Sequence, residues 1–391
     1  MEGWLDQNSL ARFVVEIVEQ LDTSAIEGVY RGGGNAPYPP KMMLALLFYC
    51  YGKGIFSSRK IEQATYELIP VLYITGGLHP DHDSINTFGK RFLEQLSPLF
   101  VEILEYACSL GIFKLGNISI DGVKIKANAS KHKAMSWEYA CKLEEQLKEE
   151  VATLLAKAEN ESGQGEREID IPQELQRRQA RLDKIGEIKA EIEQRAQARY
   201  ELESAEYESK LAERVAKEKA RARKLGGRPP TAPQPGPQAK DQINFTDSES
   251  RIMPVSGGGF EQAYNAQASV DMETMLIVGN HVSQQPNDKQ EVEPALAQLE
   301  QLPQSLGQIE KAALDSGFFS EHNTKCFEGQ RIEPYIASGR HSHNLSLEER
   351  LALPPSPPIN PDAVMAMKHR LKTETGKDFY AKRKSTVEPV F

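Results

Sequence analysis

Three acidic residues of this sequence lie where a carboxylate needs an explanation. Asp121 lies in the apolar stretch NISIDGVKIKA, and a carboxylate buried in a strand is costly unless it is hydrogen-bonded, paired or bound to a cation. Asp315 ends a second predicted strand, and Glu388 lies on a predicted terminal helix. Carboxylate oxygens suit Mg²⁺, and two such ions about 3.5–4 Å apart catalyse displacement at phosphorus. If the three acids converge, the predicted chemistry is phosphodiester cleavage or transfer with two Mg²⁺ or Mn²⁺ ions.

Other acids compete for this role. Asp288 is predicted to be the N-cap of the helix that follows it, Asp247 to lie in a turn and Asp271 to lie in a hairpin. We expect structural roles for these three residues, because Asp is a common cap and turn residue. Composition alone does not choose among the carboxylates.

Polar residues near the predicted strands have two interpretations each. Lys124 and Lys126 follow Asp121 at strand alternation, so they either bind phosphate or form a solvated strand face. Asn265 and Gln267 share one side of a later predicted strand. They either line an active site or are hydrogen-bonded within the sheet, and the sequence leaves both choices open.

Residues 1–115 are predicted to form an all-helical N-terminal domain that binds DNA. Apolar residues recur there at helical spacing in four stretches: Leu10–Leu21, Met42–Tyr51, Ile61–Leu68 and Phe92–Leu110. Arg59 and Lys60 precede the third stretch, and a helix N-terminus with two cations is a favourable place for a DNA phosphate.

Residues 116–391 are predicted to form an α/β domain. Strands are expected near 117–125, 260–271, 275–283, 310–314 and 331–337, and helices near 288–302, 320–327, 362–373 and 378–390. Within this domain, 135–225 forms a helical insertion, predicted to be an antiparallel hairpin of two long helices. A Pro/Gly-rich linker, 226–240, follows it.

Bulk properties limit the class of protein. The net charge of −9 argues against a basic surface over the whole chain, so basic clusters such as 124–133 and 377–384 have to be judged separately. The most apolar run, Met42–Tyr51, is shorter than the ~20 residues of a membrane span. The four cysteines form no C-x-x-C pair. We therefore expect a cytoplasmic protein with no membrane partner.

Six motifs occur in one order along the chain: SIDGVKIKANASK, INFTDSESRIM, AYNAQASVD, QQPNDKQ, ALDSGFFSE and YAKRKSTVEPVF. The chain resembles DDE transposases of bacterial insertion sequences, in which these motifs share this order. The resemblance runs from about Tyr38 to Phe391, and YPPKMMLALLFYCYGKGIFSSRKIEQA resembles the helical N-terminal domain of that family. It implies a ribonuclease-H-like core in which Asp121, Asp315 and Glu388 are the catalytic, metal-binding residues.

The last motif departs from the family pattern. Related transposases place Tyr, Arg, Glu and Lys on the final helix with two, three and six residues between successive members. Tyr380 and Arg383 fit, but four residues separate Arg383 from Glu388, and the Lys would fall beyond Phe391. The resemblance implies DNA-binding roles for Tyr380, Arg383 and Lys384 without deciding between the last two. We expect weak activity or none from the chain as given.

The predicted function is metal-dependent cleavage at the ends of an insertion sequence, followed by strand transfer into target DNA. The partners implied are double-stranded DNA, both element ends and target, and a second copy of the chain in a synaptic homodimer. Two alternatives remain: a C-terminally truncated, catalytically inactive DNA-binding remnant, and a helical interaction protein dominated by residues 135–223.

Overall fold

The computed structural model describes residues 2–30, 37–160, 171–221, 223–224, 226–227, 229–255, 257–339, 359 and 361–391. The chain divides into two compact units. The first comprises Met1–Asp121, Ala268–Gly279 and Glu293–Phe391, and the second comprises Gly122–Gln267 and Asn280–Val292. Among the described residues, no helix is both long enough and apolar enough to cross a membrane.

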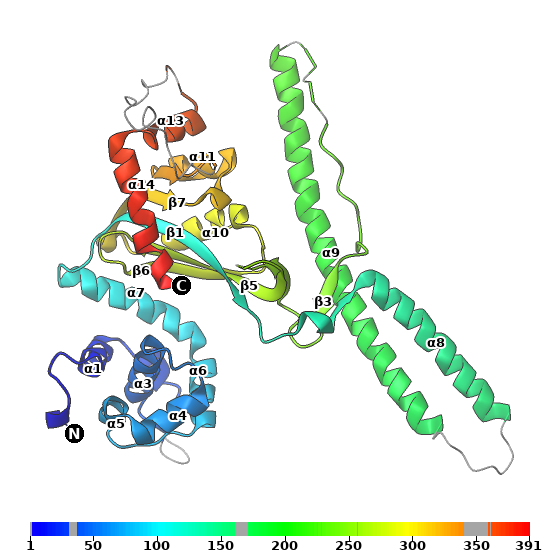
Figure 1. The fold of residues 1–391 in the computed structure, drawn as a ribbon, viewed down its shortest axis with the longest axis horizontal. Helices are drawn as coiled ribbons and strands as arrows, with labels where there is room; N and C mark the ends of the chain where they lie inside the picture. The colour runs from blue at the N-terminus through cyan, green and yellow to red at the C-terminus, as the bar shows by residue number, and fades with distance from the viewer. Residues whose placement is uncertain are drawn as a thin grey trace. The chain divides into compact units, whose positions relative to one another are not determined.

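The N-terminal part of the first unit is helical, as predicted from the sequence (Figure 1). Side-chain caps explain two of the helix starts: Ser9 accepts a hydrogen bond from the Arg12 amide, and Asp81 accepts from the amides of Asp83 and Ser84. Gly76 ends one helix in the left-handed conformation, with φ of 60°. The α-helices are α1 (Leu10–Gln20), α2 (Ser24–Glu27), α3 (Pro40–Gly52), α4 (Ser58–Glu67), α5 (Ile69–Thr75), α6 (His82–Arg91) and α7 (Leu93–Ser109).

The main sheet is mixed and has the strand order β4-β5-β1-β7-β8, with β6 paired to β5. Its strands are β1 (Leu115–Lys126), β4 (Arg251–Pro254), β5 (Phe260–Asp271), β6 (Ile277–Ser283), β7 (Gly307–Leu314) and β8 (Glu333–Ile336). β7 pairs in parallel with both β1 and β8, whereas β4 pairs antiparallel with β5. The α/β class with a helical N-terminal region is thus as predicted.

Further helices and 3₁₀ turns complete the described part of the first unit. The α-helices are α10 (Val292–Leu299), α11 (Glu321–Gly329), α13 (Ala363–Arg370) and α14 (Glu374–Thr386), and 3₁₀ turns lie at η1 (Glu2–Trp4), η4 (Gln304–Leu306), η5 (Ser316–Phe318) and η6 (Glu388–Val390). α14 packs on β7 (Figure 1). The core of the sheet is formed by side chains such as Ile118, Ile120, Ala313 and Leu314, all fully buried.

The second unit contains two long helices, α8 (Trp137–Asn160) and α9 (Ile171–Arg221) (Figure 1). They are antiparallel, because Lys189 pairs with Glu144 while Arg178 pairs with Glu150. Their contact face is apolar and includes Ile185, Ile188 and Ile192. The unit also holds the small antiparallel pair β2 (Ala134–Ser136) and β3 (Gln242–Asn244), with η2 (Lys131–Lys133) and η3 (Asp288–Gln290).

The Pro/Gly-rich segment after α9 contacts that helix. The carbonyl oxygen of Gly227 accepts a hydrogen bond from Arg214, and that of Gly236 accepts one from Arg199. Arg199 also pairs with Asp241 at 2.7 Å. The described part of this segment therefore returns alongside α9 toward the sheet strands of its own unit (Figure 1).

Two local predictions from the sequence are wrong. Glu388 does not lie on the terminal helix: α14 ends at Thr386 and Glu388 begins the 3₁₀ turn η6, because Pro389 has no amide hydrogen for an α-helical bond. Asp288 is not a helix N-cap. Asn287 caps η3 through the amide of Lys289, and the predicted helix of 288–302 contains α10 only from Val292 to Leu299.

Candidate active site

The positions of two predicted carboxylates, Asp121 and Asp315, follow from the pairing of two strands. In the parallel pairing of β1 with β7, Ile120 lies opposite Leu314. Asp121 is the next residue of β1, and Asp315 directly follows the end of β7, so the two acids come one residue after a facing pair of neighbouring strands. Asp315 caps η5, because its Oδ1 accepts a hydrogen bond from the Gly317 amide at 2.6 Å. That bond fixes the direction of the Asp315 side chain.

Arg383 of α14 joins the other two acids. Its Nη1 lies 2.7 Å from Asp121 Oδ2, and its Nη2 lies 3.4 Å from Glu388 Oε1. The Arg383 side chain is only 9% exposed, compared with 20% for Asp121 and 51% for Glu388. One guanidinium group therefore gathers carboxylates that are 262 and 5 residues away in sequence.

The acidic groups around Arg383 favour its charged form. Burial lowers the pKa of the Arg383 guanidinium, but Asp121, Tyr380 and Asp315 act in the opposite direction and leave that pKa above its ordinary value. Asp315 thus contributes to the electrostatic environment of Arg383 together with Asp121. All three predicted acids belong to the first unit.

Tyr380 lies three residues before Arg383 on α14, which places both on one face of the helix. Its hydroxyl donates a hydrogen bond to the Leu314 carbonyl at 3.0 Å, immediately before Asp315. Burial raises the pKa of the Tyr380 phenol, Arg383 opposes this effect, and Asp315 and Asp121 add to it. Tyr380 is therefore a neutral hydrogen-bond donor that holds α14 against β7. Lys384, on another face of the helix, is exposed.

The position of Glu388 depends on apolar neighbours. Val387 is fully buried against Ala268 and Val270 of β5, and Val390 packs against the same cluster. The Val387 amide closes the last turn of α14 by bonding to the Arg383 carbonyl at 3.1 Å. Because Val387 and Val390 are both packed, the turn brings the Glu388 carboxylate to the Arg383 side chain, although four residues separate the two in sequence.

A second polar cluster lies within the second unit. Asp288 Oδ1 accepts from Lys124 Nζ at 2.7 Å, Asn265 Nδ2 at 2.9 Å and Gln267 Nε2 at 3.2 Å. Asn265 and Gln267 are also bonded to one another. A Cβ on Gly122 would overlap the Gln267 amide group. The donors of the cluster thus converge on Asp288, whereas the buried Oε1 of Gln267 has no hydrogen-bond partner. Any phosphate contact by Lys124 would require its ion pair with Asp288 to open.

Asp288 is the member of this network that the sequence argument missed. Its position in QQPNDKQ suggested a cap, since Asp is a common first residue before a helix. Its partners are 21 to 164 residues away, so no local pattern could have identified them.

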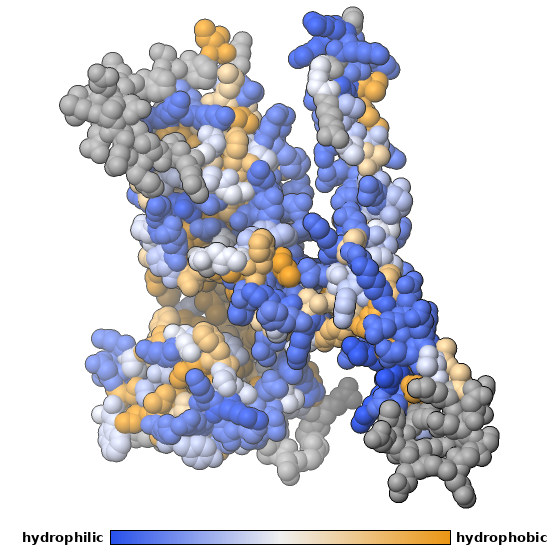
Figure 2. Space-filling model, turned by 45° about the vertical axis from the view of Figure 1, so that its right-hand side comes forward, coloured by the Kyte–Doolittle hydropathy of each residue, from blue (hydrophilic) through white to orange (hydrophobic). Residues whose placement is uncertain are grey.

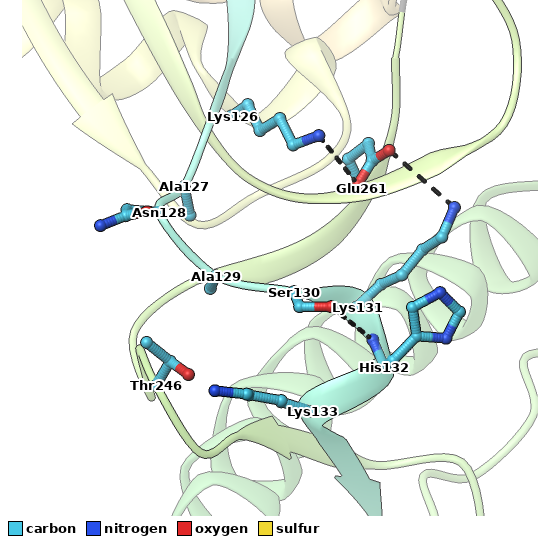
Figure 3. Close-up of a pocket in the computed structure, with 10 residues that line it drawn as sticks. All are labelled: Lys126, Ala127, Asn128, Ala129, Ser130, Lys131, His132, Lys133, Thr246 and Glu261. Carbon is cyan, nitrogen blue, oxygen red and sulfur yellow. Dashed lines mark hydrogen bonds and ion pairs between the residues drawn. The ribbon is translucent and has the colours of Figure 1, made fainter.

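Basic residues after β1 border a hollow of about 620 Å³ in the second unit (Figure 3). Lys126, Lys131 and Lys133 line it together with His132, and Glu261 pairs with Lys126 at 3.5 Å and with Lys131 at 3.9 Å. Three lysines and one carboxylate line the hollow, and two of the lysines pair with that carboxylate, so the lining carries a net positive charge. This is a suitable surface for a phosphate group.

The other predicted DNA contacts lie on the first unit. Arg59 and Lys60 are exposed in the first turn of α4. The N-cap of that helix, Ser57, forms no side-chain cap hydrogen bond. A phosphate oxygen could therefore bind the free amides of this helix end beside the two cations.

The comparison with known families bears on the N-terminal part. Residues 1–91 match the family model described as Transposase domain (DUF772). No curated protein and no solved structure matches the chain. The family match covers α1 to α6 and supports a transposase family for this protein.

Proposed function

We propose that this protein is a DDE-type DNA transposase with a ribonuclease-H-like core, and that Asp121, Asp315 and Glu388 are its catalytic carboxylates. The observation that carries the proposal is the pairing of Arg383 with both Asp121 and Glu388 beside the strand end that bears Asp315. Carboxylates that converge from separate segments are the kind of oxygen ligand that a divalent-metal centre uses. The transposase-domain match over residues 1–91 supports the same function.

The residues fit two Mg²⁺ or Mn²⁺ ions. All three side chains offer hard oxygen ligands, and two of them already share one cationic group, Arg383. When bound, the ions would activate the attacking oxygen and stabilise the leaving oxygen of an in-line displacement at phosphorus. Asp121, Asp315 and Glu388 would hold them, with Asp315 oriented by the Gly317 amide.

Arg383 and Tyr380 have distinct parts in this proposal. Arg383 would exchange its carboxylate partners for a phosphate oxygen of the DNA, which its planar fork matches well. Tyr380 keeps α14 in place through its bond to the Leu314 carbonyl. The proposal therefore treats Arg383 as a DNA-binding group and Tyr380 as a positioning residue.

We further propose that double-stranded DNA contacts three basic regions: Arg59 and Lys60 of α4, the lysine-lined hollow after β1, and Lys384 of α14. Each presents exposed positive charge, and phosphate contacts supply most of the salt-dependent affinity for DNA. Cleavage and transfer of two element ends would require two copies of the chain, so a homodimer is the proposed synaptic form.

The test compares Asp121→Asn, Asp315→Asn and Glu388→Gln with Asp241→Asn as a matched control. Asp241 also pairs with an arginine at 2.7 Å, but in the second unit. DNA carrying the repeats that flank the gene is incubated with Mg²⁺, Mn²⁺ or EDTA, and binding and nicking are measured separately. We expect all variants to bind DNA. The nicking measured with the unaltered chain, even if weak, should be lost in the three catalytic variants and retained in the control.

The other outcomes choose between the alternatives. DNA binding without nicking by the unaltered chain would indicate an inactive remnant, and neither binding nor nicking would indicate an interaction protein. An interaction protein would need a docking surface, and the surface of the long helices is mostly hydrophilic (Figure 2). Their exposed apolar side chains include Leu202 and Val215. Nicking that persists in Asp121→Asn would refute the catalytic assignment.

A further inference from the structure

Three metal-ligating side chains of different chemistry meet outside the proposed active site. Glu293 lies in the first turn of α10, and His322 and Cys326 lie four residues apart on α11, so they share one helix face. His322 Nε2 is 2.5 Å from Glu293 Oε1, and Cys326 Sγ is 3.5 Å from His322 Nε2 and 3.8 Å from Glu293 Oε1. The three ligand atoms lie within 4.8 Å of one another.

These separations suit a small tetrahedral cation. Zinc–nitrogen and zinc–oxygen bonds of ~2.0–2.2 Å with a zinc–sulfur bond of ~2.3 Å place neighbouring ligand atoms roughly 3.3–3.8 Å apart. Both contacts of the Cys326 sulfur fall in or beside that range. Only the hydrogen bond between His322 and Glu293 would have to widen, by about 1 Å. Their side chains are 70% and 65% exposed, so this adjustment meets little resistance from packing.

We propose that Glu293, His322 and Cys326 bind one divalent cation of the zinc class, with water as the fourth ligand. The mixture of thiolate, imidazole and carboxylate selects a borderline cation such as Zn²⁺ over Mg²⁺, which prefers oxygen ligands alone. The exposure of two of the ligands leaves room for the water. This site is separate from the carboxylates around Arg383, which offer oxygen ligands alone.

A bound cation would connect two helices, one of which contacts the turn that follows Asp315. Glu293 belongs to α10 and the other two ligands belong to α11, so a bound cation would connect the two helices. α11 in turn holds the turn that follows Asp315, because Asn323 Nδ2 donates a hydrogen bond to the Phe318 carbonyl at 2.7 Å. The expected role of the cation is therefore structural stabilisation of the segment that carries Asp315.

The test uses Co²⁺ as a spectroscopic substitute for Zn²⁺ on the whole chain, purified with reductant and chelator and then freed of both. A thiolate bound to Co²⁺ gives a charge-transfer band in the near ultraviolet, which an all-carboxylate site does not give. We expect one equivalent of Co²⁺ to produce this band and Zn²⁺ to remove it. Cys326→Ser should abolish the band, while Cys108→Ser, which alters another half-buried cysteine, should retain it.

His322→Gln and Glu293→Gln complete the test. Each should weaken Co²⁺ binding by more than about tenfold, since even outer partners of metal ligands contribute that much. Circular dichroism checks that the variants fold. Absence of the band in the unaltered chain, or its persistence in Cys326→Ser, would overturn the proposal. Neither result affects the proposed DNA cleavage, which is tested through Asp121, Asp315 and Glu388.

Discussion

Replacing Arg383 by Met tests whether this guanidinium neutralises the gathered carboxylates. Methionine keeps much of the length of the side chain but removes its charge and both ion pairs. Breaking a buried ion pair costs about 3–5 kcal/mol, because the remaining charge stays uncompensated. Glu388 is half exposed and Asp121 partly exposed, so solvent screening reduces the expected loss to about 2–4 kcal/mol for Arg383→Met.

The informative measurement is the effect of Mg²⁺ on thermal unfolding. If the proposed function is correct, a divalent cation would have to compete with Arg383 for Asp121 and Glu388 in the unaltered protein. In Arg383→Met that competitor is absent and the carboxylates repel one another, so Mg²⁺ should raise the melting temperature of the variant more than that of the unaltered protein. Asp121→Asn added to Arg383→Met should recover part of the lost stability, because it removes one of the uncompensated charges.

Arg199→Met is the matched control. Arg199 pairs with Asp241 at 2.7 Å, with side-chain exposures of 30% and 22%, and both residues lie in the second unit. This variant should also lose stability, but Mg²⁺ should restore much less of it, since among the described residues Asp241 is the only carboxylate that forms an ion pair with Arg199, and Glu203 acts on it at longer range. Equal Mg²⁺ effects in the two variants, or an Arg383→Met protein as stable as the unaltered one, would refute the reasoning.

Three further substitutions test the local geometry. Gly122→Ala should lower the free energy of unfolding by about 1–3 kcal/mol, because it displaces the Gln267 amide from its hydrogen bonds. Chemical denaturation measures this loss, and adding Gln267→Ala to Gly122→Ala should reverse part of it. Val387→Ala should slow DNA nicking more than it weakens DNA binding, because the packing that positions Glu388 is lost. Tyr380→Phe should keep the fold and reduce the nicking rate, because without the hydrogen bond to the Leu314 carbonyl α14 is held less firmly. An unchanged rate would count against a positioning role for Tyr380.

The sequence predicted best the features that depend on local patterns. Alternating β-branched residues identified β1, and an apolar run ending in an acid identified β7. Beyond these two strands, the neighbouring positions of Asp121 and Asp315 depend on one further fact, the parallel register that sets Ile120 opposite Leu314. Register between strands separated by about two hundred residues depends on the whole sheet, so no local pattern determines it.

Side-chain pairing across long separations was the part that the sequence could not supply. Strand periodicity predicts that Asn265 and Gln267 share a face, but it does not indicate their common acceptor, Asp288, whose local sequence is typical of a helix cap. The spacing of the cysteines likewise gives no sign that Cys326 lies near Glu293, because the residues of this cluster differ in type and come from two helices. Such clusters become visible only when tertiary contacts are known.

The geometry around Glu388 shows how the spacing of a motif can change while a contact is preserved. On a continuous α-helix, a residue five positions after Arg383 lies on a different face, about 140° away around the axis. Pro389 prevents such a continuation, and the buried Val387 anchors the turn on Ala268 and Val270. The chain therefore returns Glu388 to the Arg383 side chain, at 3.4 Å. The apolar residue before the glutamate and the proline after it are thus as important for placing this carboxylate as the count of residues between them.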